Sequence, residues 1–162
     1  SDLDALFQMQ SNELSTITQK EKLFKDAERQ WNTLSSEKGA PGRKVDFEIY
    51  KSILYNLEIR KVYLDSKLSL EKFSSIVGTN TTYLSNAVNN YFGCNFKRLI
   101  NSYRVARAKE LLDGKDCPVS ELFSRCGFAS KSVFYVAFRK VVGMTPLQYI
   151  SQSRSPFMIQ RN

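Results

Sequence analysis

The stretch RCGFASKSVFYVAFRKVVGMTPLQYI, residues 125–150, decides the fold of this chain. It mixes aromatic and aliphatic residues with basic ones and contains no acidic residue. Packing in a core would explain the apolar positions, and a surface for a polyanion would explain the charge. Gly127 and Gly143 indicate where helices end. The stretch therefore predicts a short helix that buries Phe134 and Phe138 and presents its other side to solvent.

The same pattern occurs twice in the chain. Residues 70–100 align with residues 119–150, and the matches fall on apolar positions and glycines: Leu70 with Val119, Gly78 with Gly127, Leu84 with Phe134, Val88 with Phe138, and Gly93 with Gly143. Each copy predicts a short helix that ends at glycine, a tight turn, and a second helix that begins at an N-cap residue, Asn80 or Ser130. This order is the helix-turn-helix arrangement, so the repeat is a repeated fold unit.

The other segments also predict helices, which makes the chain all-α. Residues 95–114 suit one continuous helix between the two copies. Residues 1–34 carry an amphipathic stripe that includes Leu14 and Trp31, with Trp31 expected as a packing anchor. Glycine and proline in residues 35–44 break this helix. A further helix is expected from Asp46 to Leu64, with Tyr50, Ile53, Leu57 and Leu64 on one face, followed by a turn at 65–69.

The predicted domains follow from this pattern. Residues 1–44 form a helical linker or signalling segment, and residues 45–162 form the domain that contains both repeats. Its parts are the first helix-turn-helix at about 68–93, the connecting helix at about 95–113 and the second helix-turn-helix at about 118–143. A helix of about 18 residues is roughly 27 Å long, close to the ~34 Å repeat of the major groove.

The positive charge is concentrated in the second of these segments. Residues 1–44 contain seven basic and seven acidic residues, whereas residues 45–162 have a net charge of +8. Such an imbalance favours a polyanionic partner.

Several kinds of site are excluded or disfavoured by composition. The chain has no histidine, which excludes Cys/His zinc sites and histidine-based catalytic triads. Cys94, Cys117 and Cys126 lie far apart and are expected as buried, inert thiols in a reducing cytoplasm. No signal peptide or apolar run of spanning length occurs. Because the chain starts at Ser1, an upstream sensor or membrane region outside it is an open expectation.

At this point the motifs resemble those of a known family. The segment CPVSELFSRCGFASKSVFYVAFRKVVGMTPLQYI, residues 117–150, is similar to the signature of AraC/XylS transcription regulators. The upstream copy and INSYRVARAKELL, residues 100–112, resemble that family's first helix-turn-helix and connecting helix. The resemblance implies seven helices in two helix-turn-helix subdomains, with recognition helices at about 81–91 and 131–141.

The resemblance also implies which residues face DNA. Carried over by position, they are Thr81, Thr82, Ser85, Asn86, Lys131, Ser132, Tyr135 and Val136, with Arg139 and Lys140 expected on phosphates. Asn86 can pair with the adenine edge and Lys131 with guanine or a phosphate. Family members often carry arginine at the positions of Asn86 and Val136; here Val136 can contact only a thymine methyl.

The implied partners are double-stranded DNA and RNA polymerase, with a possible homodimer through residues 1–34. No cofactor, metal or catalytic residue is expected. Two alternatives stay open: a protein-interaction module that does not bind DNA, and a DNA-alkyl-repair enzyme that uses a reactive cysteine.

Overall fold

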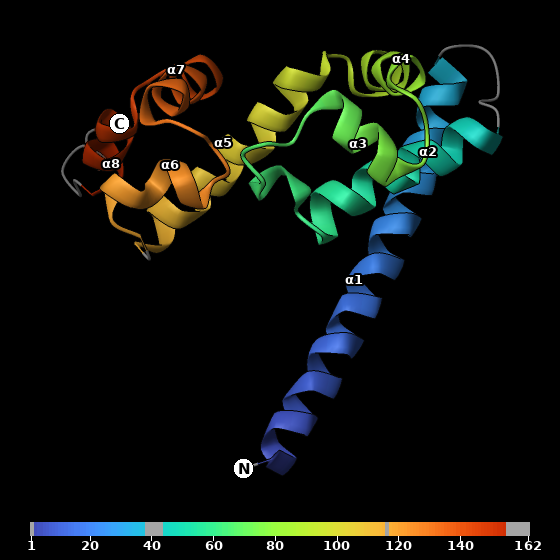
Figure 1. Cartoon of the computed structure of the whole chain (residues 1–162), viewed down its shortest axis with the longest axis horizontal. Helices are drawn as coiled ribbons and strands as arrows, with labels where there is room; N and C mark the ends of the chain where they lie inside the picture. The colour runs from blue at the N-terminus through green and yellow to red at the C-terminus, as the bar shows by residue number, and fades with distance from the viewer. Residues whose placement is uncertain (1, 38–43, 116, 155–162) are drawn as a thin grey trace. The chain divides into compact units, whose positions relative to one another are not determined.

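The computed structural model describes residues 2–37, 44–115 and 117–154, in which helices are joined by turns and no strand occurs (Figure 1). The all-α class is thereby confirmed. In chain order the helices are α1 (Asp2–Glu37), α2 (Lys44–Leu54), the π-helical turn η1 (Tyr55–Ile59), the 3-10 turn η2 (Val62–Leu64), α3 (Leu70–Val77), α4 (Thr81–Phe92), α5 (Phe96–Gly114), the 3-10 turn η3 (Val119–Glu121), α6 (Leu122–Arg125), α7 (Lys131–Val142) and α8 (Pro146–Arg154).

The chain divides into two compact units. The first comprises α1, α2 and η1 together with α3 and α4, and the second comprises η2 and α5 to α8. Each unit contains one predicted helix-turn-helix, α3–α4 in the first and α6–α7 in the second. The predicted break at 35–44 falls largely on residues 38–43, which lie outside the described residues, as does the side chain of Leu14.

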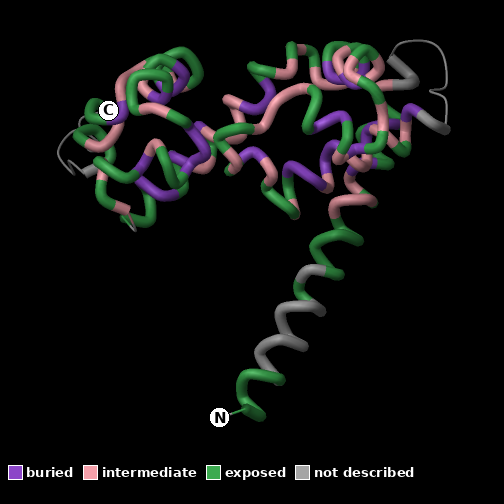
Figure 2. Tube along the Cα trace, viewed as in Figure 1, coloured by how far each residue is buried: buried purple, intermediate pink, exposed green. Residues whose placement is uncertain are grey.

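The C-terminal part of α1 belongs to the core of the first unit. Ala27 and Trp31 are buried in one cluster with Tyr50 and Leu54 of α2. In Figure 2 the buried positions of α1 lie at its C-terminal end, whereas its first turns are exposed. The prediction that Trp31 is a packing anchor is confirmed. The predicted boundary at residue 44 stays a prediction, although these contacts connect α1 to the residues beyond it.

The single helix predicted from Asp46 to Leu64 is wrong in its second half. The helix becomes a π-helical turn at Tyr55–Ile59, and the chain reverses at Lys61, whose φ of 53° lies in the left-handed region. Leu64, expected on the buried face, is 37% exposed, and Tyr63 is buried in its place. Tyr50, Ile53 and Leu57 are buried as predicted.

Arg104 explains why the chain departs from the helix there. Its Nε donates to the carbonyl of Tyr63 at 2.7 Å, and its Nη2 donates to the carbonyl of Asp65 at 2.9 Å. Burial lowers the pKa of the Arg104 guanidinium, and the nearby Asp65 carboxylate opposes that shift. Two charge-assisted hydrogen bonds hold these carbonyls in the second unit, and the Asp65 carbonyl also accepts from the Leu68 amide at 3.1 Å, which closes a turn here.

The core of the second unit joins α5 to the second helix-turn-helix. Its largest members are the aromatic rings Phe128, Phe134 and Phe138, which pack in sequence at centroid distances of 5.3 and 5.7 Å. Val105 and Ala108 of α5 are fully buried in the same cluster. These contacts fix α7 on α5 through one side of α7 and leave the opposite side exposed.

Candidate nucleic-acid interface

The first candidate recognition helix, α4, begins and ends where the sequence predicts. The side chain of Asn80 accepts a hydrogen bond from the Tyr83 amide at 2.8 Å, which satisfies one of the free amides of the first turn. The helix ends at Gly93. Leu84 and Val88 are fully buried, which confirms the predicted core face of α4.

The exposed face of α4 is uncharged and rich in amide groups. Thr82 and Asn86 are exposed, whereas Thr81 and Ser85 are half-buried. The sequence interpretation missed Asn89 and Asn90, which are exposed and follow Asn86 by three and four residues. The Asn89 amide donates to the carbonyl of Ser85 at 2.9 Å. The pair of adjacent asparagines in the sequence was the available signal.

The second candidate recognition helix, α7, has the same local design. The Ser130 hydroxyl accepts from the Val133 amide at 3.3 Å, and the helix ends at Gly143. Phe134 and Phe138 are buried, as predicted. Thr145 and Gln148 exchange side-chain and backbone hydrogen bonds at the start of α8, which begins at Pro146. This capping box fixes the chain immediately after α7.

The exposed face of α7 differs from that of α4, because it combines apolar and basic side chains. Five exposed residues share this side of the helix: Ser132, Val133, Val136, Arg139 and Lys140. Val136 lies near its centre and is 69% exposed, and Val133, which the sequence interpretation missed, is 51% exposed. The structure thus brings Ser132, Val136 and the two basic residues onto one surface.

Lys131 and Tyr135 lie at the edge of that surface. Tyr135 is half-buried and packs against Phe134 with ring centroids 5.7 Å apart. The ammonium of Lys131 lies 5.7 Å from the Tyr135 ring centroid, within the range of a cation–π contact. Tyr135 is therefore partly a packing residue, and Lys131 reaches the surface from the first turn of α7.

Helix α5 supplies basic residues that the sequence interpretation missed. Lys97 and Asn101 of α5 border the same hollow as Ser132, Val136 and Lys140 of α7. Arg98 borders an adjoining hollow between the two helices. The residues of α5 and α7 are far apart in the sequence, and only the packing of the two helices brings them together.

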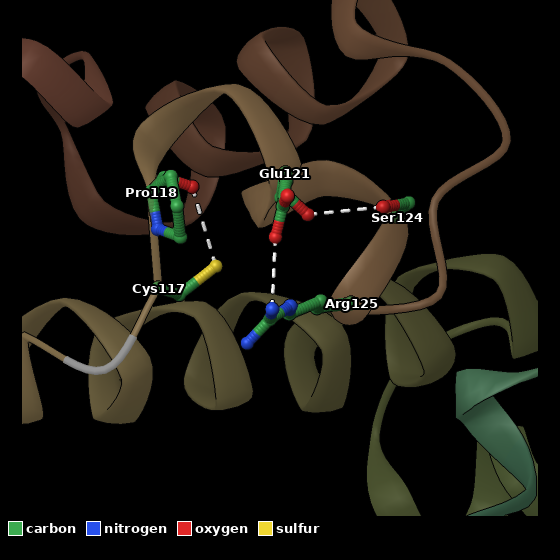
Figure 3. Close-up of polar contacts among 5 residues, drawn as sticks. All are labelled: Cys117, Pro118, Glu121, Ser124 and Arg125. Atoms are coloured by element: carbon green, nitrogen blue, oxygen red, sulfur yellow. Dashed lines mark hydrogen bonds and ion pairs between the residues drawn. The ribbon is translucent and has the colours of Figure 1, made fainter.

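The cysteines have local structural roles. Cys126 is fully buried, and burial raises the pKa of its thiol to about 12. Cys117 and Cys94 are half-buried, so the expectation that all three are buried is wrong. The Cys117 thiol donates to the carbonyl of Pro118, with Sγ–O 3.3 Å (Figure 3). Among the described residues no three His, Cys, Asp or Glu side chains gather as metal ligands.

An ion pair joins the basic residue Arg125 of α6 to Glu121 of η3. Nη2 of Arg125 lies 2.8 Å from Oε2 of Glu121, and the Ser124 hydroxyl donates to the Glu121 carbonyl at 3.0 Å (Figure 3). Glu121 partly neutralises Arg125, whereas no carboxylate is among the described residues that line the hollow beside α7.

Comparisons with known proteins identify this arrangement. Residues 73–152 match a family described as "Helix-turn-helix domain". The HTH-type transcriptional activator RhaR of Enterobacter sp. (strain 638) is 32% identical over 91 residues, which are 56% of this chain and 32% of that protein. Among solved structures, the C-terminal domain of AraT, a response regulator from Geobacillus stearothermophilus, shares 28% identity with a TM-score of 0.58, covering 65% of this chain and 84% of that one. A transcriptional regulator from Chromobacterium violaceum, described as an AraC-type DNA-binding domain-containing protein, shares 25% identity with a TM-score of 0.50, covering 55% of this chain and 80% of that one.

The chain carries an AraC/XylS-type helix-turn-helix domain. The resemblance seen in the sequence is thereby confirmed, and α4 and α7 are the second helices of its two helix-turn-helix copies. The match spans 14%, 32% and 35% of the lengths of three curated relatives, all of them described as transcriptional regulators or activators. Within the described ranges, no helix is both long and apolar enough to cross a membrane.

Proposed function

We propose that this chain binds double-stranded DNA sequence-specifically and regulates transcription, with α4 and α7 as recognition helices in successive major grooves. The observation that carries the proposal is the exposed face of α7, where Ser132, Arg139 and Lys140 stand opposite the buried Phe134 and Phe138. A helix held by one side and basic on the other suits the major groove, which admits an α-helix.

The first unit supplies direct hydrogen bonding to bases. Asn86 is exposed on α4 and can pair with the N6 and N7 edge of adenine. Thr81, Thr82 and Ser85 offer hydroxyls at the start of the same helix, where residues of a recognition helix reach base edges. We therefore expect α4 to contribute more to sequence preference than to electrostatic attraction.

The second unit supplies most of the phosphate contacts. Arg139 and Lys140 are exposed on α7, and Lys131 and Tyr135 lie at the edge of the same surface. Phosphate contacts position a protein on the duplex without specifying sequence. We therefore expect α7 and its surroundings to dominate the salt dependence of binding.

Two grooves are proposed because the chain contains two such units and a long α5. With 19 residues, α5 is roughly 28 Å long, which is comparable with the ~34 Å between successive major grooves on one face of DNA. We further infer a cytoplasmic regulator without enzymatic activity that contacts RNA polymerase. A homodimer through α1 is also proposed, since Leu3, Leu6 and Ile17 are exposed on that helix.

Selection of bound sequences from a random duplex pool tests the proposal. The full chain is expected to enrich one motif with two conserved blocks about one helical turn apart. Asn86→Ala should relax the preference in one block by about 1–3 kcal/mol. Lys131→Ala should alter the other block, because it removes an ammonium that can donate to guanine as well as to phosphate.

A matched control and a contrary result complete this experiment. Lys25→Ala removes an exposed charge from α1 and is expected to leave the motif unchanged. Absence of duplex binding at low salt would instead support the protein-interaction module, and an unchanged motif in both recognition-helix variants would refute the assignment of direct readout.

A further inference from the structure

The centre of the α7 surface is apolar, which is unusual for a position expected to meet a polyanion. Val133 and Val136, here called the valine pair, are 51% and 69% exposed. They are three residues apart on α7, so their Cβ atoms are about 5–6 Å apart. An exposed apolar patch rimmed by polar residues can mark a contact site.

The valine pair lies in a hollow with basic walls. The hollow has a volume of about 320 Å³ and is lined by Lys97, Asn101, Ser132, Val133, Val136, Ala137 and Lys140. The adjoining hollow, about 550 Å³, adds Arg98 and Asn95 from the start of α5. The described residues that line the two hollows include three basic residues and no carboxylate, so their charge complements an anion rather than a cation or a basic peptide.

The chemistry of this hollow selects among the groups that DNA presents. Valine neither donates nor accepts a hydrogen bond, so it leaves the polar edges of guanine and cytosine without the partners that water gave them. Thymine is the one standard base with a methyl group in the major groove. An apolar patch flanked by lysines therefore fits a thymine methyl with phosphates on either side.

We propose that the valine pair reads thymine C5-methyl groups in the major groove, with Lys97 and Lys140 on the flanking phosphates. This inference rests on the proposed DNA-binding function and adds the base that the second unit recognises. Val133 and Lys97 are new to the site, and together with Val136 and Lys140 they form one surface from two helices.

The first unit provides an internal contrast. The repeat aligns Tyr83 and Asn86 of α4 with Val133 and Val136 of α7. Asn86 is exposed and offers an amide where α7 offers an isopropyl group. The methyl-reading property therefore belongs to the second unit, and the two halves of the binding site should differ in their response to removal of methyl groups.

Replacement of thymine by deoxyuridine removes the methyl group and preserves base pairing. We would measure binding of the full chain to the selected duplex and to duplexes with single T→U changes in each block. One or two changes in the block read by α7 are expected to weaken binding about fourfold each, the effect of one buried carbon. In the block read by α4, the same changes are expected to alter binding less than twofold.

Variants that keep the shape of valine test whether the valine pair causes the response to T→U. Val133→Thr and Val136→Thr together keep the branched shape but exchange one methyl group at each position for a hydroxyl, so they are expected to reduce the response to T→U. Leu147→Thr, at an exposed apolar residue of α8, should preserve that response. Circular dichroism would confirm that each variant is folded.

The outcomes separate this inference from the proposed function. Tight duplex binding with no response to T→U, or an undiminished response in the double variant, overturns the methyl reading and leaves DNA binding intact. Failure to bind any duplex would overturn both.

Discussion

At the residue scale, Gly78 and Gly127 occupy equivalent places in the two repeats but have different surroundings. Both have a positive φ, 91° and 92°. A Cβ at Gly78 would meet no atom within 4 Å, whereas a Cβ at Gly127 would overlap the Tyr63 carbonyl and lie 2.9 Å from Cα of Leu64. At residue 78 only the positive φ favours glycine. At residue 127 a side chain would also collide with the backbone of η2, so both the φ and the packing favour glycine.

This difference predicts unequal losses of stability. Gly78→Ala is expected to lower the free energy of unfolding by about 1–2 kcal/mol through the left-handed conformation. Gly127→Ala should cost about 1–3 kcal/mol more, because η2 must move. Thermal and urea unfolding of both variants provide the measurement. Equal losses of unfolding free energy would show that η2 moves away from a Cβ at residue 127 at no cost in stability.

We expect the Cys126 thiol to be unreactive in the folded protein. Burial raises its pKa from an ordinary value of 9.0 to about 12, so the thiolate that reacts with alkylating agents is scarce at pH 8. We expect labelling of Cys126 in the native state at least about 100-fold slower than in urea, measured by mass spectrometry. Half-buried Cys94 provides the comparison, and rapid native labelling of Cys126 would contradict its burial.

The raised pKa of Cys126 also predicts how the free energy of unfolding depends on pH. Since the folded-state pKa lies above the unfolded one, the contribution of Cys126 is complete below pH 9 and is lost as the pH rises toward 12. This burial also argues against the alkyl-repair alternative for Cys126, because such chemistry needs an accessible thiolate.

At the element scale, α1 is connected to α4, the first candidate recognition helix, through one aromatic cluster. The Trp31 ring lies 4.7 Å from Tyr91 of α4 and 5.6 Å from Tyr50 of α2, measured between centroids. Tyr91 also donates to the Asp46 carboxylate at 3.1 Å. A change in the C-terminal part of α1 would therefore reach the recognition helix directly by packing.

Trp31→Ala is expected to destabilise the first unit by about 3–5 kcal/mol, as for other large buried aromatics. Leu6→Ala is the control on the same helix, since Leu6 is 58% exposed, and its effect should stay within about 0.5 kcal/mol. Urea unfolding followed by circular dichroism measures both. Similar stability in the two variants would support the predicted boundary of the folded domain at residue 44.

The elements themselves were predictable where local periodicity decides them. Leu84 and Phe134 recur at helical spacing with Val88 and Phe138, so α4, α7 and their buried faces could be derived from the sequence. The reversal at Lys61 could not, because it depends on Arg104, more than 40 residues away in the chain.

The candidate site, too, was predictable only in the parts that do not depend on tertiary packing. Its polar positions on α4 and α7 were carried over from the resemblance to the AraC/XylS family. The missed Val133 shares a helical face with Ser132 and Val136, and that face could have been derived from the period of the helix. Lys97 needed the packing of α5 on α7, which no local pattern reports.

At the scale of the whole molecule, the distribution of charge predicts how DNA binding depends on salt. All of the net charge of +8 lies in residues 45–162. If about six phosphates are neutralised, the slope of log K against log salt should be near −5.

Lys97→Ala and Lys140→Ala should each make that slope about 1 unit less negative, because each removes one released counterion. Lys25→Ala should not change it, although it alters the net charge equally. Fluorescence anisotropy titrations between about 50 and 200 mM salt measure these slopes on the selected duplex. If all three variants shift the slope alike, attraction depends on total charge, and the surface formed by α5 and α7 does not hold the phosphates.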